Sequence, residues 1–404
     1  MATTRIEFEN AKSVKLAGAL ELPPGRIRGA ALFAHCFTCT AKSRGATRIS
    51  RALARVGIAT LRFDFTGLGG SEGDFANGGF MSDVDDIVSA AAWLKDWCPE
   101  DVGEGLILVG HSLGGAAVLA AAHKIPHVDA IATIGAPADV PHVLERIDGD
   151  LDAILQKGEG EVNISGRPFT IGAGFIDSVR DTDLLASVAK LRQPLLILHS
   201  PVDNIVGVEN ARALYEAARH PKSYVSLDDA DHLMLKERDA HYAASVIAAW
   251  AERYLPPAAE ADSSGVVVET GHGKFGTQVT AGAHSWVSDE PKSYGGEDAG
   301  PTPYDHLLAA LGTCTAMTLK FYAEREGIPM TSARVTLTHE RDHVHDSEHA
   351  ADEDEAMQAI YRKIELSGDL TDKQRAQLMV IADRCPVHKT LEGELHVHSE
   401  LVGD

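Results

Sequence analysis

Residues 106–115 read LILVGHSLGG. The four branched apolar residues Leu106–Val109 predict a strand that is buried on both faces of a parallel sheet. The small residues that follow the glycines predict a helix, so the pattern G-x-S-x-G lies between a strand and a helix. A sharp turn there would expose the Oγ atom of Ser112, and side chains in place of Gly110 and Gly114 would clash across it. We therefore predict that Ser112 is a nucleophile; the alternative is a glycine-rich structural turn.

Apolar segments with strand and helix periodicity alternate along residues 1–255, which predicts a doubly wound, mainly parallel α/β sheet with helices on both faces. Residues 139–193 interrupt the alternation with helical stretches and a hairpin, and predict a cap inserted at the carboxyl edge of the sheet. The alternative is a loop-rich excursion without a catalytic role. The predicted elements are a hairpin over 5–22, strands at 29–34, 58–63, 130–134, 195–198 and 224–227, and helices at 43–56, 80–97, 208–218 and 240–254.

A serine hydroxyl is a poor nucleophile unless a base removes its proton and a carboxylate orients that base. Asp203 follows the predicted strand 195–198, and His232 follows the predicted strand 224–227. The order Ser112, Asp203, His232 along the chain is the one expected when a nucleophile elbow lies in this architecture. The alternatives are that Asp203 is a turn residue and that His232 is a surface histidine in an acidic loop.

An oxyanion formed at the substrate carbonyl needs two hydrogen-bond donors. We predict the backbone N–H of Leu113, directly after the elbow, and the backbone N–H of Phe37 in the loop 35–39. The same loop contains Cys36 and Cys39 at redox spacing. Because this segment lacks the helix N-terminus that redox motifs use, we predict no redox role for this pair.

Residues 1–255 resemble the α/β-hydrolase family in the elbow, in the order of the three predicted residues and in RFDFTGLGGSEG at residues 62–73. The resemblance implies a serine hydrolase that cleaves carboxylic esters through an acyl-enzyme, without a metal or organic cofactor. Thioesterase and peptidase activities are the alternatives within the same chemistry.

The chain has 404 residues and a net charge of −22. The acidic balance argues against a nucleic-acid partner, and no apolar segment is long enough to span a bilayer. The first residues lack the apolar core of a signal peptide, and five cysteines are few and odd in number. We therefore expect a cytoplasmic protein with reduced thiols. Residues 256–264 have linker composition and separate a hydrolase domain, 1–255, from a second domain, 265–404.

The second domain has an α+β pattern. Thr302 and Pro303 form an N-cap and N1 pair that predicts a helix over 303–325. The histidine- and aspartate-rich stretch 339–354 predicts a solvated loop rather than a metal site. The apolar face of the helix is predicted to hold Leu307, Leu311, Cys314, Thr318 and Phe321; further strands are predicted at 334–339, 364–368 and 395–401, and a helix at 372–382.

Two cysteines of this domain lie in distinctive stretches. Spacing alone would allow Cys314 and Cys385 to be ordinary buried core residues. The stretches GPTPYDHLLAALGTC at 300–314 and CPVH at 385–388, however, closely resemble the osmotically inducible protein C family. The resemblance covers about residues 265–404.

This second resemblance implies thiol peroxidase activity on organic hydroperoxides and an intertwined homodimer with its sites at the subunit interface. Cys314 would become a sulfenic acid, Cys385 would condense with it to a disulfide, and an external dithiol would reduce that disulfide. No arginine occurs between Arg253 and Arg325, where the family has its thiolate-activating arginine. We predict Lys274 as the stand-in and Asp305 as the supporting acid. The alternative is a domain kept only for dimerisation or binding.

Overall fold

The computed structural model describes residues 2–36, 39–98, 105–164, 167–255, 265–342 and 357–402. The contacts divide the chain into two compact units, Met1–Gly300 and Pro301–Asp404. Among the described helices, none combines the length and the apolar character that crossing a membrane requires.

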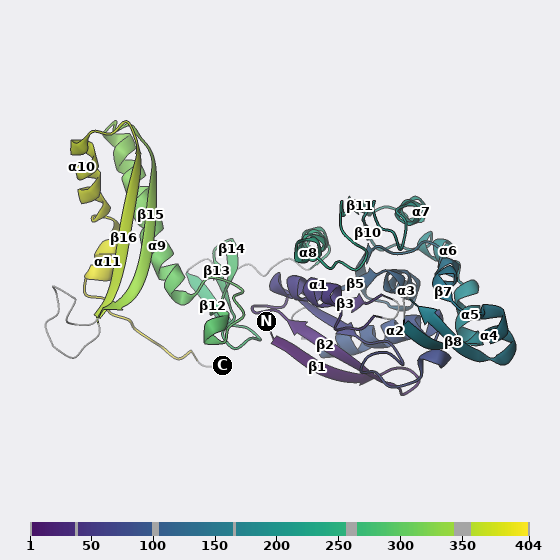
Figure 1. Cartoon of the computed structure of the whole chain (residues 1–404). Helices are drawn as coiled ribbons and strands as arrows, with labels where there is room; N and C mark the ends of the chain where they lie inside the picture. Colours follow the sequence, from purple (N-terminus) through teal and green to yellow (C-terminus); the bar gives the residue numbers. More distant parts are fainter. Residues whose placement is uncertain are drawn as a thin grey trace. The chain divides into compact units, whose positions relative to one another are not determined.

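The first unit is built on one eight-stranded sheet with the order β1-β2-β4-β3-β5-β6-β10-β11 (Figure 1). The hairpin β1–β2 and the pair β2–β4 are antiparallel, and the remaining pairs are parallel. The predicted mainly parallel α/β sheet is therefore confirmed. The strands are β1 (Ala2–Glu9), β2 (Lys15–Leu22), β3 (Gly29–Ala34), β4 (Ile58–Phe63), β5 (Leu106–His111), β6 (Val128–Ile134), β10 (Leu195–His199) and β11 (Lys222–Ser226).

Helices cover both faces of this sheet, which explains why its central strands are continuous apolar runs. In β5, Ile107 and Val109 face the core beneath α1 and α8, whereas Leu106 and Leu108 face the core beneath α2 and α3. All six residues of β5 are buried. The helices are α1 (Arg44–Arg55), α2 (Phe80–Trp97), α3 (Leu113–Ala121), α7 (Glu209–Ala217) and α8 (Glu237–Ala251), with short 3-10 turns η1 (Phe75–Asn77) and η3 (Ala122–Lys124).

The insertion between β6 and β10 contains the predicted hairpin within a small antiparallel sheet, β7-β8-β9. Phe75 of η1 packs against Phe169 and Phe175 of the insertion, with ring centroids 5.3 and 6.3 Å apart. The insertion therefore packs against the core of the first unit. Its elements are η4 (Pro141–Arg146), β7 (Ile147–Asp148), α4 (Leu151–Lys157), β8 (Glu159–Ile164), β9 (Arg167–Gly172), α5 (Ala173–Arg180) and α6 (Leu184–Val188).

A three-stranded antiparallel sheet follows, formed by β12 (Val266–Thr270), β13 (Thr277–Ala281) and β14 (His284–Ser288). A 3-10 turn, η5 (Lys292–Tyr294), comes next. By their contacts these elements belong to the first unit, although the predicted domain boundary precedes them. The predicted linker, 256–264, lies outside the described residues, so the boundary stays a prediction.

The second unit packs helices against a long antiparallel strand pair. The central helix α9 begins with the predicted cap, in which Thr302 and Asp305 form a reciprocal capping box. A small apolar core joins α9 and α10 to the strands. The elements are α9 (Pro303–Arg325), β15 (Met330–Asp342), β16 (Met357–Gly368), α10 (Asp372–Ala382) and α11 (Pro386–Glu392).

Two predictions for this unit are wrong. The strand predicted at 395–401 is absent, and Leu395, Val397 and Leu401 are exposed. A strand needs a neighbour for its backbone hydrogen bonds, and no described strand of this chain pairs with 395–401.

The predicted apolar face of α9 is also shifted. The buried residues are Leu311, Thr315, Leu319 and Ala323, at steps of four, whereas Phe321 is 68% exposed. Residues four apart lie on one face of a helix, and this face is the one that packs against β15, α10 and α11. The packing therefore buries Thr315 and leaves Cys314 half-buried.

Candidate active site

Ser112 lies on a tight turn between the carboxyl end of β5 and the first residue of α3. Its φ of 55° places it in the left-handed region, which is costly for a serine and is stabilised here by the surrounding structure. A Cβ atom on Gly110 would overlap the carbonyl oxygen of Gly114, and one on Gly114 would overlap that of His35. The glycines predicted from the motif are thus required by close backbone approach.

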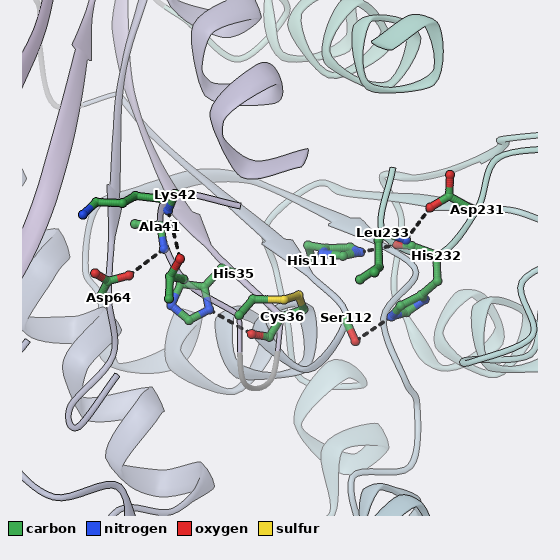
Figure 2. The surroundings of a disulfide bond; sticks show 12 residues. His35, Cys36, Ala41, Lys42, Asp64, His111, Ser112, Asp231, His232 and Leu233 are labelled. Carbon is green, nitrogen blue, oxygen red and sulfur yellow. Dashed lines mark hydrogen bonds between the residues drawn. A yellow bond between two sulfur atoms is a disulfide. The ribbon is translucent and has the colours of Figure 1, made fainter. Parts of the chain in front are cut away.

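A chain of hydrogen bonds joins the three residues that the sequence predicts. The hydroxyl of Ser112 lies 3.0 Å from Nε2 of His232, and Nδ1 of His232 lies 2.7 Å from Oδ2 of Asp203. An ionised carboxylate only accepts hydrogen bonds, so Nδ1 carries the imidazole hydrogen and Nε2 accepts from Ser112. Figure 2 shows the bond between Ser112 and His232. This arrangement can move the serine proton to the imidazole.

The environment of Asp203 keeps it ionised. Burial opposes its charge, but the hydrogen bond from His232, the charge of His232 and the backbone N–H groups of Val206 and Ile205 outweigh burial and lower the pKa of Asp203. Those two N–H groups bond to Oδ1 at 3.0 and 2.9 Å. The carboxylate is therefore oriented by the loop and charged when it meets His232.

Gly135, at the end of β6, is a site residue that the sequence reasoning missed. Its φ is 56°, and a Cβ atom there would lie 3.3 Å from Oδ2 of Asp203 and 3.4 Å from Nδ1 of His232. A side chain would crowd the acid–base pair. The available signal was a glycine directly after a buried strand.

His111, the last residue of β5, positions His232 through a hydrogen bond to its backbone. Its Nε2–H group donates to the backbone carbonyl of His232 at 2.6 Å, and the two rings lie 5.1 Å apart. Burial, together with the charges of His232 and His35, lowers the pKa of His111 to about 3. His111 is therefore a neutral donor that anchors the His232 loop.

The low pKa of His111 predicts a pH-dependent stability. In the unfolded chain His111 has a pKa of about 6.5. As the pH falls below that value, His111 is protonated in the unfolded chain but stays neutral in the folded chain. Stability should therefore be lost by roughly 1 kcal/mol per pH unit through this residue. His111→Gln keeps an N–H donor and cannot titrate, so urea unfolding at pH 7 and pH 5 should show a smaller loss than in the wild type. Equal losses in the two proteins would contradict this assignment.

The two predicted oxyanion donors are unequally described. Leu113 is the first residue of α3, where a backbone N–H has no acceptor within the helix. Phe37 lies outside the described residues. The position of Leu113 is compatible with the predicted role, and both donors stay predictions.

The expectation of reduced thiols is wrong for the loop after β3. Cys36 and Cys39 form a disulfide, with Cα atoms 5.3 Å apart, and the N–H of Cys39 also donates to the carbonyl of Cys36. This turn brings the two cysteines within bonding geometry. The Nδ1–H group of His35 donates to the same carbonyl at 2.8 Å. In Figure 2 the disulfide lies between His35 and Ser112, so it closes the predicted oxyanion loop beside the nucleophile.

Opening this disulfide should slow the hydrolysis that the sequence predicts. The bond ties together the ends of the loop that holds the predicted donor, and a loosened donor stabilises the oxyanion less well. We expect the double variant Cys36→Ser/Cys39→Ser, or reduction by a dithiol, to lower kcat about tenfold or more, with a small change in KM. Cys98→Ser is the control, because Cys98 lies outside this disulfide. Mass spectrometry should first show that the Cys36–Cys39 bond is open. An unchanged kcat in that protein would refute a role for the disulfide in catalysis.

The second unit brings polar groups around Cys385. Cys385 is wholly buried, and its sulfur lies 3.7 Å from the hydroxyl of Thr315, the residue after Cys314. The sulfur also accepts the backbone N–H of His388 at 3.3 Å. Helix α11 packs against α9, which places the two cysteine-bearing segments side by side.

Comparison with known proteins places this geometry in a family. Residues 29–292, well over half of the chain, match the model of the alpha/beta hydrolase family. The chain belongs to the α/β-hydrolase family. Residues 295–400 match the model of the OsmC-like proteins, so the hydrolase carries an OsmC-like region at its carboxyl side.

Several characterised and uncharacterised proteins are similar to the hydrolase. The crystal structure of the esterase domain of a Rhodothermus marinus protein is 45% identical, covers 63% of this chain and 99% of that chain, and gives a TM-score of 0.52. The uncharacterized protein YfhR of Salmonella typhi is 30% identical over 42% of this chain. Palmitoyl-protein thioesterase ABHD10, mitochondrial, of Rattus norvegicus is 29% identical over 48% of this chain and 66% of that protein. The match spans about half, 53%, of the length of YfhR.

Of the two predicted supports for a thiolate at Cys314, Asp305 has another role within this chain, and Lys274 stays a prediction. The carboxylate of Asp305 caps α9 by accepting the N–H and hydroxyl of Thr302. These bonds lower the pKa of Asp305. Nine residues separate Asp305 from Cys314, about 13 Å along the helix, so Asp305 does not reach that thiol within one chain. Lys274 lies in the first unit, with Nζ 4.8 Å from the centroid of the Phe275 ring.

The structure places near Cys385 an arginine that the sequence reasoning missed. Arg362 of β16 donates to Thr315 at 3.1 Å, and Thr315 contacts Cys385. Arg362 lies outside residues 253–325, the range in which the family resemblance implies such an arginine. The predicted strand also began at 364, two residues after Arg362, so nothing in the pattern indicated which way this side chain faces.

A cavity of about 460 Å³ lies away from the nucleophile. It is lined at the amino ends of β3 and β5 by Ala30 and Leu106, together with Val88 and Lys95 of α2. Ser112 follows the carboxyl end of β5, on the opposite edge of the sheet. This cavity therefore lies apart from Ser112, Asp203 and His232.

Of the histidine-rich stretch, residues 343–356 lie outside the described residues, and only His339 of its four histidines falls within them, on β15. In the part of the chain that the structure describes, no three His, Cys, Asp or Glu side chains are grouped closely enough to hold a metal ion. The solvated loop predicted there stays a prediction.

Proposed function

We propose that the hydrolase cleaves carboxylic esters through an acyl-enzyme on Ser112. The observation that carries this proposal is the hydrogen-bonded chain from Ser112 to His232 and Asp203 on the elbow. The 45% identity to the esterase domain of the Rhodothermus marinus protein supports an ester as the substrate.

The proposed reaction has two halves. His232 takes the proton of Ser112 as Oγ attacks the carbonyl carbon, and the N–H of Leu113 stabilises the oxyanion together with the predicted donor at Phe37. The imidazolium, held by Asp203, then protonates the leaving alcohol and leaves an acyl-serine. Water, deprotonated by the same imidazole, releases the carboxylic acid and restores the serine. No metal or organic cofactor takes part in these steps.

Thioester cleavage is the second candidate. The 29% identity to palmitoyl-protein thioesterase ABHD10 of Rattus norvegicus favours it, and the same three residues would serve, since a thiolate leaves more easily than an alkoxide. Peptide cleavage demands protonation of a poorer leaving group and has no specific support among the relatives.

A matched substrate set separates these activities. p-Nitrophenyl esters of short and long acyl groups, the corresponding acyl thioesters and a peptide anilide should be compared on the full chain, with a fluorophosphonate label reporting the serine. We expect label on the wild type, none on Ser112→Ala, and the largest kcat/KM with esters. A larger kcat/KM for thioesters would favour the second candidate, and absence of label on the wild type would contradict a serine mechanism.

We propose further that the OsmC-like region reduces organic hydroperoxides with its cysteines. A thiolate at Cys314 would attack the terminal oxygen of the hydroperoxide, breaking the O–O bond, releasing an alcohol and leaving a sulfenic acid. Cys385 would displace water from that sulfur and form a disulfide, which an external dithiol would reduce. The buried thiol of Cys385 beside α9 supports this proposal.

Mass spectrometry after one equivalent of cumene hydroperoxide tests the thiol chemistry. A Cys314–Cys385 disulfide is the expected product, and Cys314→Ser should abolish hydroperoxide consumption. Unmodified thiols at both positions would leave the region with a dimerising or binding role only.

We propose that two copies of the hydrolase associate through residues 265–404. Within one chain, Met317 and Phe321 of α9 are 70% and 68% exposed. Two large apolar side chains exposed four residues apart on one helix favour burial by a partner. Light scattering should give a dimer for the full chain and a smaller mass for Met317→Glu/Phe321→Glu, with Lys320→Glu as the control on the same helix. A monomeric wild type would contradict this assembly.

A further inference from the structure

The buried thiol of Cys385 lies among hydrogen-bonding groups rather than in an apolar core. Its sulfur accepts the N–H of His388 at 3.3 Å and lies 3.7 Å from the hydroxyl of Thr315. Both Cys385 and Thr315 are wholly buried. A structural core cysteine has no need of such neighbours.

The direction of the Thr315 hydroxyl hydrogen decides whether this hydroxyl donates to Cys385 or accepts from it. Thr315 donates its one hydrogen to the carbonyl of Leu311 at 2.8 Å, and it accepts a hydrogen from Arg362 at 3.1 Å. The remaining lone pair faces Cys385, so a thiol there donates to Thr315. When Cys385 is a thiolate, rotation about the Cβ–Oγ1 bond turns the Thr315 hydrogen from Leu311 to the sulfur. Two donors, Thr315 and the N–H of His388, then hold the anion.

Arg362 is fixed so that one nitrogen faces this hydroxyl. Its Nη1 group also donates to the carbonyl of Ala382 at 3.2 Å, and its Nη2 group pairs with Asp383 at 2.5 Å. The Arg362 side chain is 12% exposed, whereas that of Asp383 is 63% exposed. The guanidinium therefore joins β16 to the end of α10, directly before Cys385, and gives Thr315 a fixed donor.

We infer that Arg362 is a positioning residue that acts through Thr315 to hold Cys385 for disulfide formation. The inference rests on the proposed hydroperoxide chemistry. The Cys385 thiolate attacks the sulfur of the Cys314 sulfenic acid, the S–S bond forms, and the S–O bond breaks. The departing hydroxide takes up the proton that Cys385 had released, giving water. Cys385 sulfur is oxidised, the sulfenic sulfur is reduced, and the external dithiol later returns two electrons.

This assignment separates the two thiol steps. Arg362 contacts the neighbour of Cys385, and no described hydrogen bond links it to Cys314. Loss of Arg362 should therefore slow disulfide formation and leave the first oxidation unchanged. A residue needed only for folding would affect both steps together.

The test follows both steps in the full chain after one equivalent of cumene hydroperoxide, by rapid quenching and peptide mass spectrometry. Arg362→Met and Thr315→Val should each slow disulfide formation about tenfold or more, with the rate of sulfenic acid formation unchanged. Arg362→Lys and Thr315→Ser should be affected less. Arg375→Met is the matched control, since Arg375 of the same unit bonds to the carbonyl of Leu366. Disulfide formation at the wild-type rate in Arg362→Met, or equal slowing in Arg375→Met, would overturn the inference.

A second measurement does not depend on hydroperoxide. In the Cys314→Ser background, the exchange rate of Cys385 with an aromatic disulfide should fall about tenfold on adding Arg362→Met, as read at the Cys385 peptide. An unchanged or faster exchange would overturn the role of Arg362. A wild type that hydroperoxide does not oxidise would instead refute the proposed peroxidase, and the exchange rates would still decide the role of Arg362.

Discussion

Ser112→Ala is expected to lower kcat/KM for a p-nitrophenyl ester by roughly 10³-fold or more. The substitution removes the nucleophile and leaves only binding and the oxyanion donors. Because Ser112, His232 and Asp203 form one hydrogen-bonded chain, their losses should not add. The double variant Ser112→Ala/His232→Ala should be no slower than either single variant by more than a few-fold.

The matched control is Ser200→Ala. Ser200 is also buried at the carboxyl edge of the sheet, but its hydroxyl donates to the carbonyl of Asp228 at 3.0 Å and not to His232. Its removal should change kcat/KM by less than about tenfold, in the range of a lost neutral hydrogen bond. Initial rates across a substrate series and circular dichroism spectra check both variants. Substantial turnover by folded Ser112→Ala would refute the nucleophile assignment.

Asp203→Asn is expected to have the next largest effect, a loss of roughly 10³- to 10⁴-fold in kcat. Asparagine can keep the Oδ1 contacts with the N–H groups of Ile205 and Val206, so the loop should stay in place. Its amide would present hydrogens to Nδ1 of His232, which favours the tautomer with a hydrogen on Nε2. That tautomer cannot accept the proton of Ser112.

Asp231→Asn is the control for charge near the base. Asp231 precedes His232 in the chain, but its carboxylate accepts the backbone N–H groups of Leu233 and Leu235 at 3.0 and 3.1 Å, and the residue is half-buried. We expect kcat within about tenfold of the wild type, because the Asp231 carboxylate is bonded to those backbone N–H groups rather than to the His232 ring, and a partly exposed charge is partly screened. If Asp231→Asn were the slower of the two variants, the assignment of Asp203 as the acid would be wrong.

Local sequence patterns were sufficient to predict those helices and strands in which all residues favour the same structure. β5 and α3 follow from a branched apolar run, two glycines and a small-residue run, and α2 begins and ends where its apolar spacing predicts. The positions of Asp203 and His232 followed from the rule that parallel strands present their following loops at one edge. These inferences needed only the order of residues, since each signal lies within one element and the loop after it.

Contacts between segments that are distant in the sequence could not be predicted from local patterns. Gly135 approaches Asp203 across the sheet edge, and His111 reaches the carbonyl of His232, 121 positions away. The strand predicted at 395–401 had the right alternation, but pairing depends on a neighbour that alternation does not supply. Likewise, the spacing of Cys36 and Cys39 allowed a bond, and only the turn between β3 and α1 brought the two cysteines together.

The sequence by itself determined the α/β class, the elbow at Ser112 and the order of its partners. These features depend on short-range sterics and hydrophobic periodicity, which consecutive residues define. Only the tertiary structure decided which face of α9 is buried and that Arg362 meets Thr315 beside Cys385. Arg362 and Thr315 are 47 residues apart, and the direction of each side chain is set by the packing of β16 and α10 against α9. Packing of that kind is a property of all the elements together, so no single segment carries a signal for it.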